Sequence, residues 1–300
     1  MSASDTATGA SPNILHRPGG RRLAWTENGA HDGRPVVVLH GTPGCRLSRY
    51  GDDENLRKAG IRQISYERPG YGYSDPQPGR SVKDAVADIE VILDAAGVER
   101  AGFIGNSGGG PHALAVATLL ASRATLVHCN VGVAPRLLLG DEGFFEGMDP
   151  ENIRRFRAAD LPREQTHAAL TSDLDRMVAA ARVDPMTIAG DMKMPEADAA
   201  VMRLTAASYA ANFIEALRPG YWGFIDDFSA MARDWGFDPR EAEAPVIIEY
   251  GFHDVNVPEG HGRWLAENIP GATVIVNAEG GHRSLPQKFL ERLKTLAQAK

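Results

Sequence analysis

A serine in a glycine-rich turn is the residue best placed in this chain to do chemistry. Ser107 lies in the segment 105–110, GNSGGG, which matches the pattern G-x-S-x-G. A run typical of a buried strand, 101–105, comes before it, and a helical pattern begins at Gly108. A strand, a sharp turn and a helix in this order predict a nucleophile elbow, where small glycines leave room for the backbone. The serine would also lie at a helix N-terminus, where free N–H groups favour negative charge.

A serine hydroxyl is a weak nucleophile, so it needs a base, and the base needs an acid to orient it. After an elbow of this kind the acid comes next along the chain and the histidine comes last. Asp254 follows the expected strand 246–250, and His282 follows the expected strand 273–276. Both therefore belong at the same edge of the sheet as Ser107. We expect His282 to be the base and Asp254 its acid.

The loop 40–44, HGTPG, follows the expected strand 36–39 and is the candidate for the rest of an oxyanion hole. Such a hole needs two backbone N–H groups that converge on one point. The elbow supplies the N–H of Gly108, and the loop after a neighbouring strand supplies the N–H of Thr42. His40 is expected to brace this loop rather than to act as a base.

Each of these residues also has a plainer interpretation. The turn at 105–110 could hold a phosphate, and Asp254 could simply form a turn. If Asp254 were not the acid, Asp141 or Glu142 would be the replacement. Cys45, beside the oxyanion loop, is expected to be a buried small side chain rather than a second nucleophile.

Strands and helices that could position these residues alternate along most of the chain, and this alternation predicts an α/β fold with a parallel sheet. Several strands are continuous apolar runs, as expected when helices cover both faces of a sheet. The expected strands are 36–39, 62–66, 101–105, 126–131, 246–250 and 273–276. The expected helices are 46–59, 81–96, 108–121, 258–268 and 284–298, with Gly97 at a helix end.

The stretch 136–240 interrupts this alternation with helical patterns and prolines but no strand. We expect it to be a helical cap, or lid, over the carboxyl edge of the sheet, although extra helices on the flank of the sheet would give the same pattern. The α/β core is then expected over 21–135 and 241–300. Residues 1–20 are polar and rich in glycine and proline, so they are expected to form a flexible tail.

Composition excludes several classes of function. The 300 residues carry a net charge of −7, which argues against nucleic acid or an anionic membrane as a partner. No apolar run approaches the roughly 20 residues needed to cross a bilayer, and no secretory signal is visible. Two cysteines without a C-x-x-C pair favour a reducing cytoplasm over a disulfide framework or thiolate metal site. We expect a cytoplasmic monomer or homodimer that acts on a small molecule.

Taken together, the motifs resemble those of α/β-hydrolase fold enzymes over about residues 23–299. The resemblance rests on the HGTPG loop, the GNSGGG elbow, the segment 66–75 (YERPGYGYSD), the run 251–258 (GFHDVNVP) and the terminal Gly-His. It implies an eight-stranded, mostly parallel sheet, a helical cap after the sixth strand, and a Ser-His-Asp triad. The triad would be Ser107, Asp254 and His282. One departure is Glu67, where many relatives have Asp.

The expected activity is therefore that of a serine hydrolase, which cleaves a carboxylic ester or related acyl bond through an acyl-enzyme without metal or organic cofactor. A serine at the elbow does not fit haloalkane dehalogenases or epoxide hydrolases of this fold, which use Asp there. The alternatives are a C–C hydrolase, an acyltransferase, a cyclase, a proline iminopeptidase-like peptidase and, least favoured, a non-catalytic ligand receptor. Proline iminopeptidases typically carry Trp where this chain has Gly108.

An apolar substrate pocket would be lined by aromatic and Met side chains of the cap. The candidates are Phe144, Phe145, Met148, Phe213 and Trp222, together with Tyr221, Phe224 and Phe228. Such side chains can equally pack the core of the cap itself. A pocket of this kind would suit a moderately apolar ester, lactone or thioester.

Overall fold

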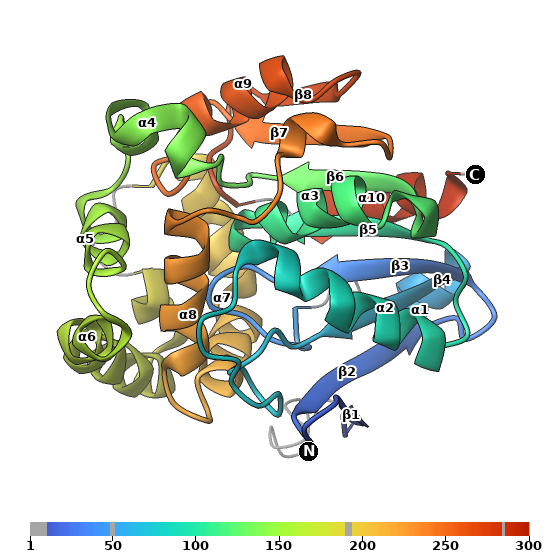
Figure 1. Ribbon diagram of the computed structural model, residues 1–300, viewed down its shortest axis with the longest axis horizontal. Helices are drawn as coiled ribbons and strands as arrows, with labels where there is room; N and C mark the ends of the chain where they lie inside the picture. Colours follow the sequence, from blue (N-terminus) through green and yellow to red (C-terminus); the bar gives the residue numbers. More distant parts are fainter. Residues whose placement is uncertain (1–10, 49–51, 190–193, 284–285, 300) are drawn as a thin grey trace.

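The protein is built around one eight-stranded sheet, with strand order β1-β2-β4-β3-β5-β6-β7-β8. The computed structural model describes residues 11–48, 52–189, 194–283 and 286–299 (Figure 1). The strands are β1 (Asn13–His16), β2 (Arg22–Gly29), β3 (Arg34–Leu39), β4 (Ile61–Tyr66), β5 (Ala101–Asn106), β6 (Ala124–Asn130), β7 (Val246–Gly251) and β8 (Thr273–Asn277). Only the pairs β1–β2 and β2–β4 are antiparallel. The predicted α/β class with a mostly parallel eight-stranded sheet is confirmed.

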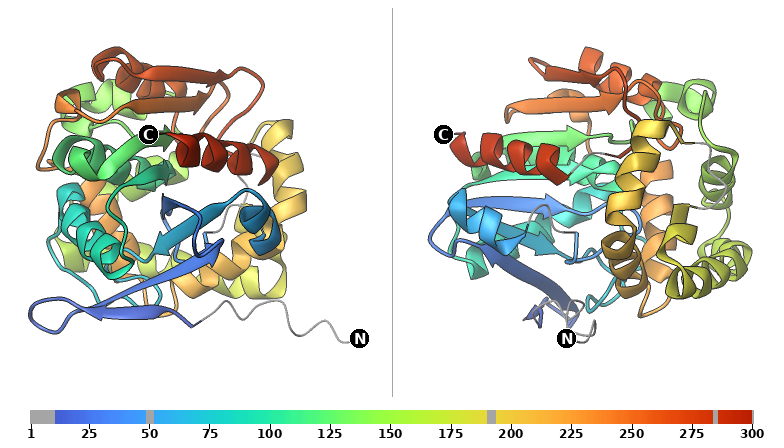
Figure 2. Two further views of the ribbon diagram at one scale, coloured as in Figure 1. Left: turned by 90° about the vertical axis from the view of Figure 1, so that its right-hand side faces the viewer. Right: turned by 180° about the vertical axis from the view of Figure 1, so that it is seen from behind.

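The central strands are buried because helices cover both faces of the sheet (Figure 2). Alternate side chains of a strand point to opposite faces. In β3, Val37 and Leu39 accordingly join the apolar core beneath α2 (Ala85–Ala95) and α3 (Gly110–Leu119). Val36 and Val38 join the core beneath α1 (Asp53–Lys58) and α10 (Pro286–Gln298). The continuous apolar runs of the sequence therefore supply side chains to two separate apolar clusters, one on each face of the sheet.

Local sequence explains where several helices begin and end. The side chain of Asp52 accepts the N–H of Asn55 at the start of α1. Gly97, predicted at a helix end, follows α2 with φ +64°, and its N–H bonds the carbonyl of Asp94. The remaining helix of the core, α9 (Glu259–Asn268), packs beside β7.

A helical insertion, residues 136–232, separates β6 from β7. It contains α4 (Arg136–Phe145), α5 (Pro150–Ala158), α6 (Arg163–Val183), α7 (Glu196–Ala216) and α8 (Trp222–Ala232). Figure 1 shows α5 to α8 grouped at the end of the sheet toward which the parallel strands point. An apolar cluster joins the insertion to loops of the core, with Tyr71, Val133 and Val257 on the core side.

The structure differs from the sequence prediction near the N-terminus. Residues 1–20 were expected to form a flexible tail, but Asn13–His16 form β1, which pairs antiparallel with β2. Neither strand was predicted. The strand β1 is only four residues long, and its hydrogen bonds come from pairing with β2, so its own sequence gave too short a pattern to predict it. Residues 1–10 lie outside the described part of the chain.

The helix expected over 46–59 is much shorter in the structure, where α1 spans only Asp53–Lys58. Tertiary contacts hold residues 45 and 46 outside any helix. The N–H of Cys45 bonds the Asn212 side chain, and Arg46 pairs with Glu67 and Glu215. These contacts to α7 and to the loop after β4 outweigh the local helical tendency. Residues 49–51 lie outside the described part of the chain.

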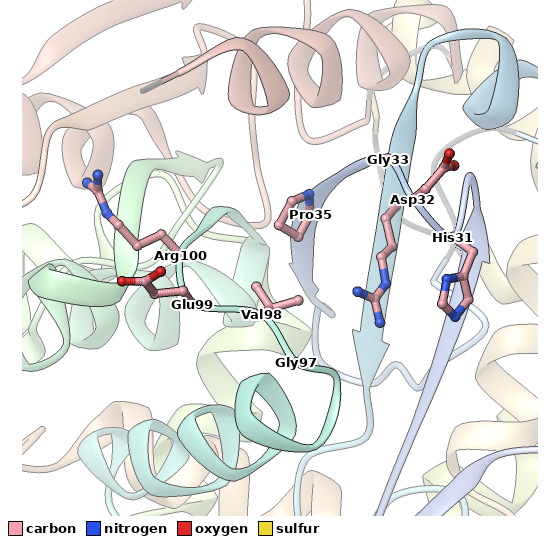
Figure 3. Close-up of a pocket in the computed structure, with 9 residues that line it drawn as sticks. His31, Asp32, Gly33, Pro35, Gly97, Val98, Glu99 and Arg100 are labelled. Atoms are coloured by element: carbon pink, nitrogen blue, oxygen red, sulfur yellow. The ribbon is translucent and has the colours of Figure 1, made fainter.

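The two edges of the sheet differ in what surrounds them. At the amino ends of the strands lies a surface hollow of about 410 Å³, lined by residues at the start of β3 and β4 and by residues just before β3 and β5 (Figure 3). Its lining includes His31, Asp32, Arg62 and Glu99. Ser107 follows the carboxyl end of β5, so this hollow is remote from it. Within the described ranges no helix is both long and apolar enough to span a membrane.

Candidate active site

Three side chains that are far apart in sequence meet at the carboxyl edge of the sheet. The Nε2 atom of His282 lies 2.9 Å from Oγ of Ser107, and Nδ1 lies 2.7 Å from Oδ2 of Asp254. The Asp254 side chain is fully buried, whereas 13% of the His282 side chain is exposed. With Nδ1–H donating to the carboxylate, Nε2 is free to accept the serine O–H. The arrangement is that of a nucleophile, a base and an orienting acid.

Ser107 stands on a tight turn between β5 and α3. Its φ of +55° lies in the left-handed region that non-glycine residues rarely adopt. Glycines on either side let the chain close this turn. A Cβ on Gly105 would lie 2.2 Å from the carbonyl oxygen of Gly109, and a Cβ on Gly109 would lie 2.1 Å from that of Leu39. The elbow predicted from the sequence is therefore present in the structure. Close backbone contacts around the turn keep Ser107 in its strained backbone conformation.

Asp254 is oriented by the turn that follows β7. Its Oδ1 accepts the backbone N–H groups of Asn256 at 2.8 Å and Val257 at 2.9 Å. Its other oxygen, Oδ2, is thereby directed to His282. One oxygen is used for structure and the other for the imidazole, so the carboxylate is held in a single orientation.

The two expected oxyanion donors, Thr42 and Gly108, are neighbours. A Cβ on Gly108 would lie 2.3 Å from Oγ1 of Thr42, and a Cβ on Gly41 would lie 3.5 Å from Cβ of Ser107. Gly108 is the second residue of a short 3₁₀ helix, Ser107–Gly109, where an N–H has no acceptor within the helix. The structure thus brings the HGTPG loop against the elbow, as an oxyanion hole requires.

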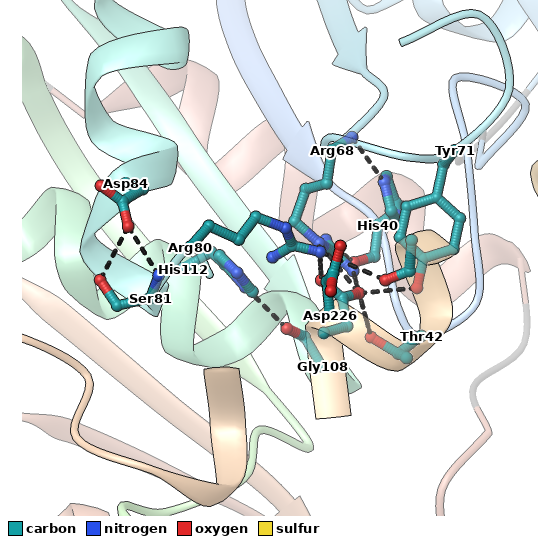
Figure 4. Close-up of polar contacts among 12 residues, drawn as sticks. His40, Thr42, Arg68, Tyr71, Arg80, Ser81, Asp84, Gly108, His112 and Asp226 are labelled. Carbon is teal, nitrogen blue, oxygen red and sulfur yellow. Dashed lines mark hydrogen bonds and ion pairs between the residues drawn. The ribbon is translucent and has the colours of Figure 1, made fainter. Parts of the chain in front are cut away.

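A buried cluster of charged side chains bonds the HGTPG loop (Figure 4). Asp227 of α8 accepts hydrogen bonds from Thr42 Oγ1 at 2.7 Å, Tyr71 at 2.9 Å, and the guanidiniums of Arg68 and Arg80. Burial alone would raise the pKa of Asp227, but the two guanidiniums hold it well below its ordinary value. Arg68 also donates to the carbonyls of His40 and Gly41, so the loop backbone is held along with the Thr42 side chain.

Two buried histidines bond the backbone of the HGTPG loop and of the elbow. The Nδ1–H of His40 donates to the Gly41 carbonyl, and its Nε2 accepts the N–H of Arg68. Burial lowers the pKa of His40 well below its ordinary value, so the ring is neutral. His112 donates to the carbonyl of Gly108, and burial lowers its pKa to about 3. His40 thus contacts the loop in the bracing manner that the sequence predicts.

The described contacts of the five predicted pocket residues lie mostly within the helical insertion, although the ring of Phe144 also packs against His261 of α9. Phe144, Met148 and Phe213 are buried in its apolar cluster. Phe145 lies against two guanidinium groups, and Trp222 lies against one guanidinium and stacks on a histidine ring. Contact with a substrate stays a prediction for these side chains.

The structure also places the replacement acid Asp141 and the second possible nucleophile, Cys45. Asp141, the replacement acid, is half-exposed and pairs with Arg136 and Arg157, while Asp254 occupies the position beside His282. Because Asp254 bonds His282, the structure gives no reason to turn to the replacement acids Asp141 or Glu142. Cys45 is buried, its Sγ lies 3.1 Å from the Asn212 side chain, and burial raises the pKa of its thiol. A neutral thiol in that position is a packing residue.

Sequence reasoning missed two carboxylates of the insertion that contact this site, Asp227 and Asp198. Asp227 contacts the oxyanion loop, and Asp198 accepts the backbone N–H of His282. Both lie in helical patterns where acidic residues are usually solvated, so the sequence carried no signal for them. Among the described residues, no group of His, Cys, Asp and Glu side chains gathers in a way that could hold a metal ion.

Comparison with known proteins identifies the family. Residues 34–289 match the model of the alpha/beta hydrolase fold family. This chain belongs to the α/β-hydrolase fold family. The matched range contains the HGTPG loop, the elbow at Ser107, Asp254 and His282, and the expected family resemblance is confirmed.

Individual relatives of this α/β-hydrolase are also hydrolases. A 2-hydroxy-6-oxononadienedioate/2-hydroxy-6-oxononatrienedioate hydrolase from Pseudomonas putida is 30% identical over 256 residues, covering 82% of this chain and 80% of its own length. A proline iminopeptidase from Xylella fastidiosa is 27% identical over 293 residues, covering 91% and 90%. An esterase from Exiguobacterium antarcticum superposes with a TM-score of 0.67 at 21% identity, covering 96% and 100%, a likeness of fold alone. The protein is a hydrolase.

Proposed function

We propose that this α/β-hydrolase cleaves a carboxylic ester or a related acyl bond through a covalent acyl-enzyme. The proposal is carried by the continuous line of hydrogen bonds from Asp254 through His282 to Ser107. A hydroxyl at 2.9 Å from an imidazole nitrogen can transfer its proton to that nitrogen as it attacks a carbonyl carbon. The buried carboxylate then stabilises the imidazolium that forms.

The remaining steps use the backbone N–H groups of Thr42 and Gly108, the imidazole of His282 and a water molecule. As Ser107 attacks, the carbonyl oxygen becomes an oxyanion, which would accept the N–H groups of Thr42 and Gly108. Each such donor contributes about 3–4 kcal/mol of barrier lowering. The imidazolium of His282 returns its proton to the leaving alkoxide, and the alcohol departs. Water, deprotonated by the same imidazole, then attacks the acyl-enzyme and releases the acid and the serine.

The helical insertion, in this proposal, is the cap that covers the substrate. Its helices lie at the carboxyl edge of the sheet, and α8 reaches the oxyanion loop through Asp227. Its apolar cluster includes Phe213, Phe224 and Phe228. A cap of this composition favours a moderately apolar acyl or alcohol group and keeps bulk water away from the oxyanion.

The test is hydrolysis of short p-nitrophenyl esters by the wild-type protein and by Ser107→Ala. We expect the variant to lose turnover by several orders of magnitude while it keeps its fold, because only a hydroxyl is removed. A fluorophosphonate probe should label the wild-type protein and not the variant. Equal ester turnover in the two proteins would refute Ser107 as nucleophile. Absence of both turnover and labelling in the wild type would favour a non-catalytic receptor.

A second candidate is hydrolysis of a carbon–carbon bond next to a ketone. It is favoured by the relatives whose names specify 2-hydroxy-6-oxononadienedioate, at 26–30% identity. A compound with that name contains a ketone and two carboxylates but no ester, so its hydrolysis has to break a C–C bond. The same serine and oxyanion donors could act on such a ketone.

A direct competition separates these two candidates. The protein would be given a 2-hydroxy-6-oxodienoate and a p-nitrophenyl ester, and kcat/KM would be measured for each. A value for the dienoate at least 100-fold above that for the ester would replace the ester proposal. The opposite ratio would support it. Analysis of products with added alcohol or thiol acceptors would reveal acyl transfer, and a product of unchanged composition would reveal cyclisation.

An aminopeptidase function has less support, although one relative is a proline iminopeptidase. Such an enzyme would need free carboxylates in the cap to hold the substrate's amino group. Four acidic residues of the insertion are candidates for this role, namely Asp141, Glu142, Glu146 and Asp149. Of these, Asp141 is already paired with two guanidiniums. Hydrolysis of proline p-nitroanilide at a rate above that of the esters would reverse this ranking.

A further inference from the structure

Asp198 makes an unusual set of hydrogen bonds with the loop that carries His282. It belongs to the first turn of α7, in the helical insertion, and is only 2% exposed. Its Oδ1 accepts the N–H of Gly281 at 3.0 Å. Its Oδ2 accepts the N–H of His282 at 2.7 Å and that of Arg283 at 3.2 Å. Three consecutive backbone donors of the histidine loop therefore converge on one carboxylate.

Burying the carboxylate of Asp198 costs free energy, and helix capping does not explain its position. An acidic residue in a first turn ordinarily faces the N–H groups of its own helix or solvent. Here the carboxylate turns away from α7, and burial raises the pKa of Asp198 although the N–H groups of Gly281 and His282 lower it. A buried carboxylate is tolerated when several donors satisfy it, as these three do.

The histidine loop is also shaped to receive this carboxylate. A Cβ on Gly281 would lie 2.8 Å from Oδ2 of Asp198 and 2.9 Å from Cγ of Pro195, so only glycine allows the approach. On its other side, the loop accepts the N–H of His253 at the carbonyl of Gly280. The backbone at His282 is thus held between the turn after β7 and the first turn of α7.

We propose that Asp198 is a positioning residue, which holds the backbone of His282 so that the imidazole reaches Ser107. The inference rests on the proposed role of His282 as base. It means that the insertion does more than cover the substrate, because it completes the geometry of the triad. A carboxylate at the backbone of His282 also favours the imidazolium that forms when Ser107 loses its proton.

The test uses Asp198→Ala, which removes all three acceptors, and Asp198→Asn, which keeps the shape but removes the charge. Glu196→Ala is the matched control, because Glu196 lies in the same turn of α7 but is exposed and pairs with Arg203. Gly281→Ala perturbs the same contact from the loop side. The measurements are kcat and KM for a p-nitrophenyl ester, the rate of fluorophosphonate labelling, and the thermal midpoint.

We expect kcat and the labelling rate to fall about tenfold to a hundredfold in the Asp198 and Gly281 variants, since misplacement of a base by about 1 Å has effects of this size. KM should change less than about threefold, because no substrate contact is removed. Glu196→Ala should match the wild type. A purely structural role would lower the thermal midpoint without changing the kcat of the protein that remains folded.

The pH profile provides a readout that a structural role would not move. Two carboxylates bond His282: Asp198 from α7 accepts its backbone N–H, and Asp254 from the turn after β7 bonds its imidazole. The guanidinium of Arg283, the next residue, lies over the ring of Tyr209. In Asp198→Asn one negative charge is lost, so the acid limb of the kcat/KM profile should move to lower pH. In Glu196→Ala the profile should keep its position.

The outcomes separate this inference from the proposed function. If wild-type protein is labelled and Ser107→Ala is not, while the Asp198 and Gly281 variants keep wild-type kcat and labelling rates, the positioning role is wrong and the serine mechanism stands. If the wild type shows neither turnover nor labelling, the proposed function fails and the positioning role falls with it. Loss of kcat together with a displaced acid limb supports the inference.

Discussion

His282 is held from two sides: Asp254 bonds its imidazole at 2.7 Å, and Asp198 bonds its backbone N–H at 2.7 Å. The first carboxylate comes from the α/β core and the second from the helical insertion. The Nε2 atom of His282 lies 2.9 Å from Oγ of Ser107, although 175 residues separate the two in the chain. The position of His282 therefore depends on how the helical insertion packs against the α/β core.

Asp254→Asn should lower kcat by about 10⁴-fold with a small change in KM, because an amide cannot stabilise the imidazolium and favours the wrong tautomer. The fold should persist, since the remaining oxygen can still accept the N–H groups of Asn256 and Val257. The measurement is ester hydrolysis over a range of substrate concentrations. Asp238→Asn is the control, because Asp238 also accepts a backbone N–H two residues on but is distant in the fold. Retention of more than a tenth of wild-type kcat in Asp254→Asn would contradict the assigned acid.

Gly108→Ala should lower kcat about 10²-fold to 10³-fold by displacing an oxyanion donor. The new Cβ would lie 2.3 Å from Oγ1 of Thr42, which cannot easily move because Asp227 and Arg68 both bond it. Gly260→Ala is the matched control, since a Cβ there meets nothing within 4 Å. That variant should keep full activity and gain about 0.5–1 kcal/mol of stability in its helix. Ester kinetics and urea unfolding of both variants provide the comparison, and equal activities would argue against the oxyanion assignment.

Asp227→Asn should lower the free energy of unfolding by about 3–5 kcal/mol, because it leaves two buried guanidiniums without a counter-charge. The side chains of Arg68 and Arg80 are at most 2% exposed, and Asp227 is fully buried. Glu54→Gln is the control: the side chains of Glu54 and of its partner Lys58 are both more than two-thirds exposed, so its loss should be about 1 kcal/mol or less. Urea unfolding measures both losses. Similar losses in the two variants would show that burial of the cluster is not the deciding factor.

Stability should fall as the pH drops below about 6.5, the ordinary value for histidine in the unfolded chain. Burial lowers the pKa of His112 to about 3 and that of His261 to about 4, and it lowers that of His40 well below its ordinary value. Between these folded values and 6.5, the unfolded chain binds protons that the folded protein does not. The contribution of these neutral histidines to the free energy of unfolding is therefore fully present above pH 6.5. It is lost on acidification, at about 1.4 kcal/mol per pH unit for each such histidine.

Urea midpoints at pH 8, 6.5 and 5.5 measure this loss. His261→Gln should make the dependence on pH less steep by the share of one histidine, because glutamine does not titrate. His31→Gln, at an exposed position, should leave the slope unchanged. A midpoint that stays constant from pH 8 to pH 5.5 would show that the buried rings are not the source of acid sensitivity.

Much of the site was predictable because its residues follow local rules. Ser107 is identified by the strand, turn and helix around it, and Thr42 by the loop after a strand. Asp254 and His282 follow the strands β7 and β8, and carboxyl ends of parallel strands meet at one edge. These are properties of short segments and of strand direction, so the amino-acid order alone determined the α/β class and placed the triad candidates together.

Only the tertiary structure decided what supports that site. Asp198 bonds the backbone of a residue 84 positions away, and Asp227 bonds Arg68 across 159 positions. Neither contact has a local pattern, because both depend on which face of a helix the docked insertion turns toward the core. The same holds for β1, whose pairing partner supplies its hydrogen bonds, and for Phe145 and Trp222, which lie against guanidiniums. Periodicity specifies that a helix has an apolar face, whereas packing determines what that face and its polar neighbours touch.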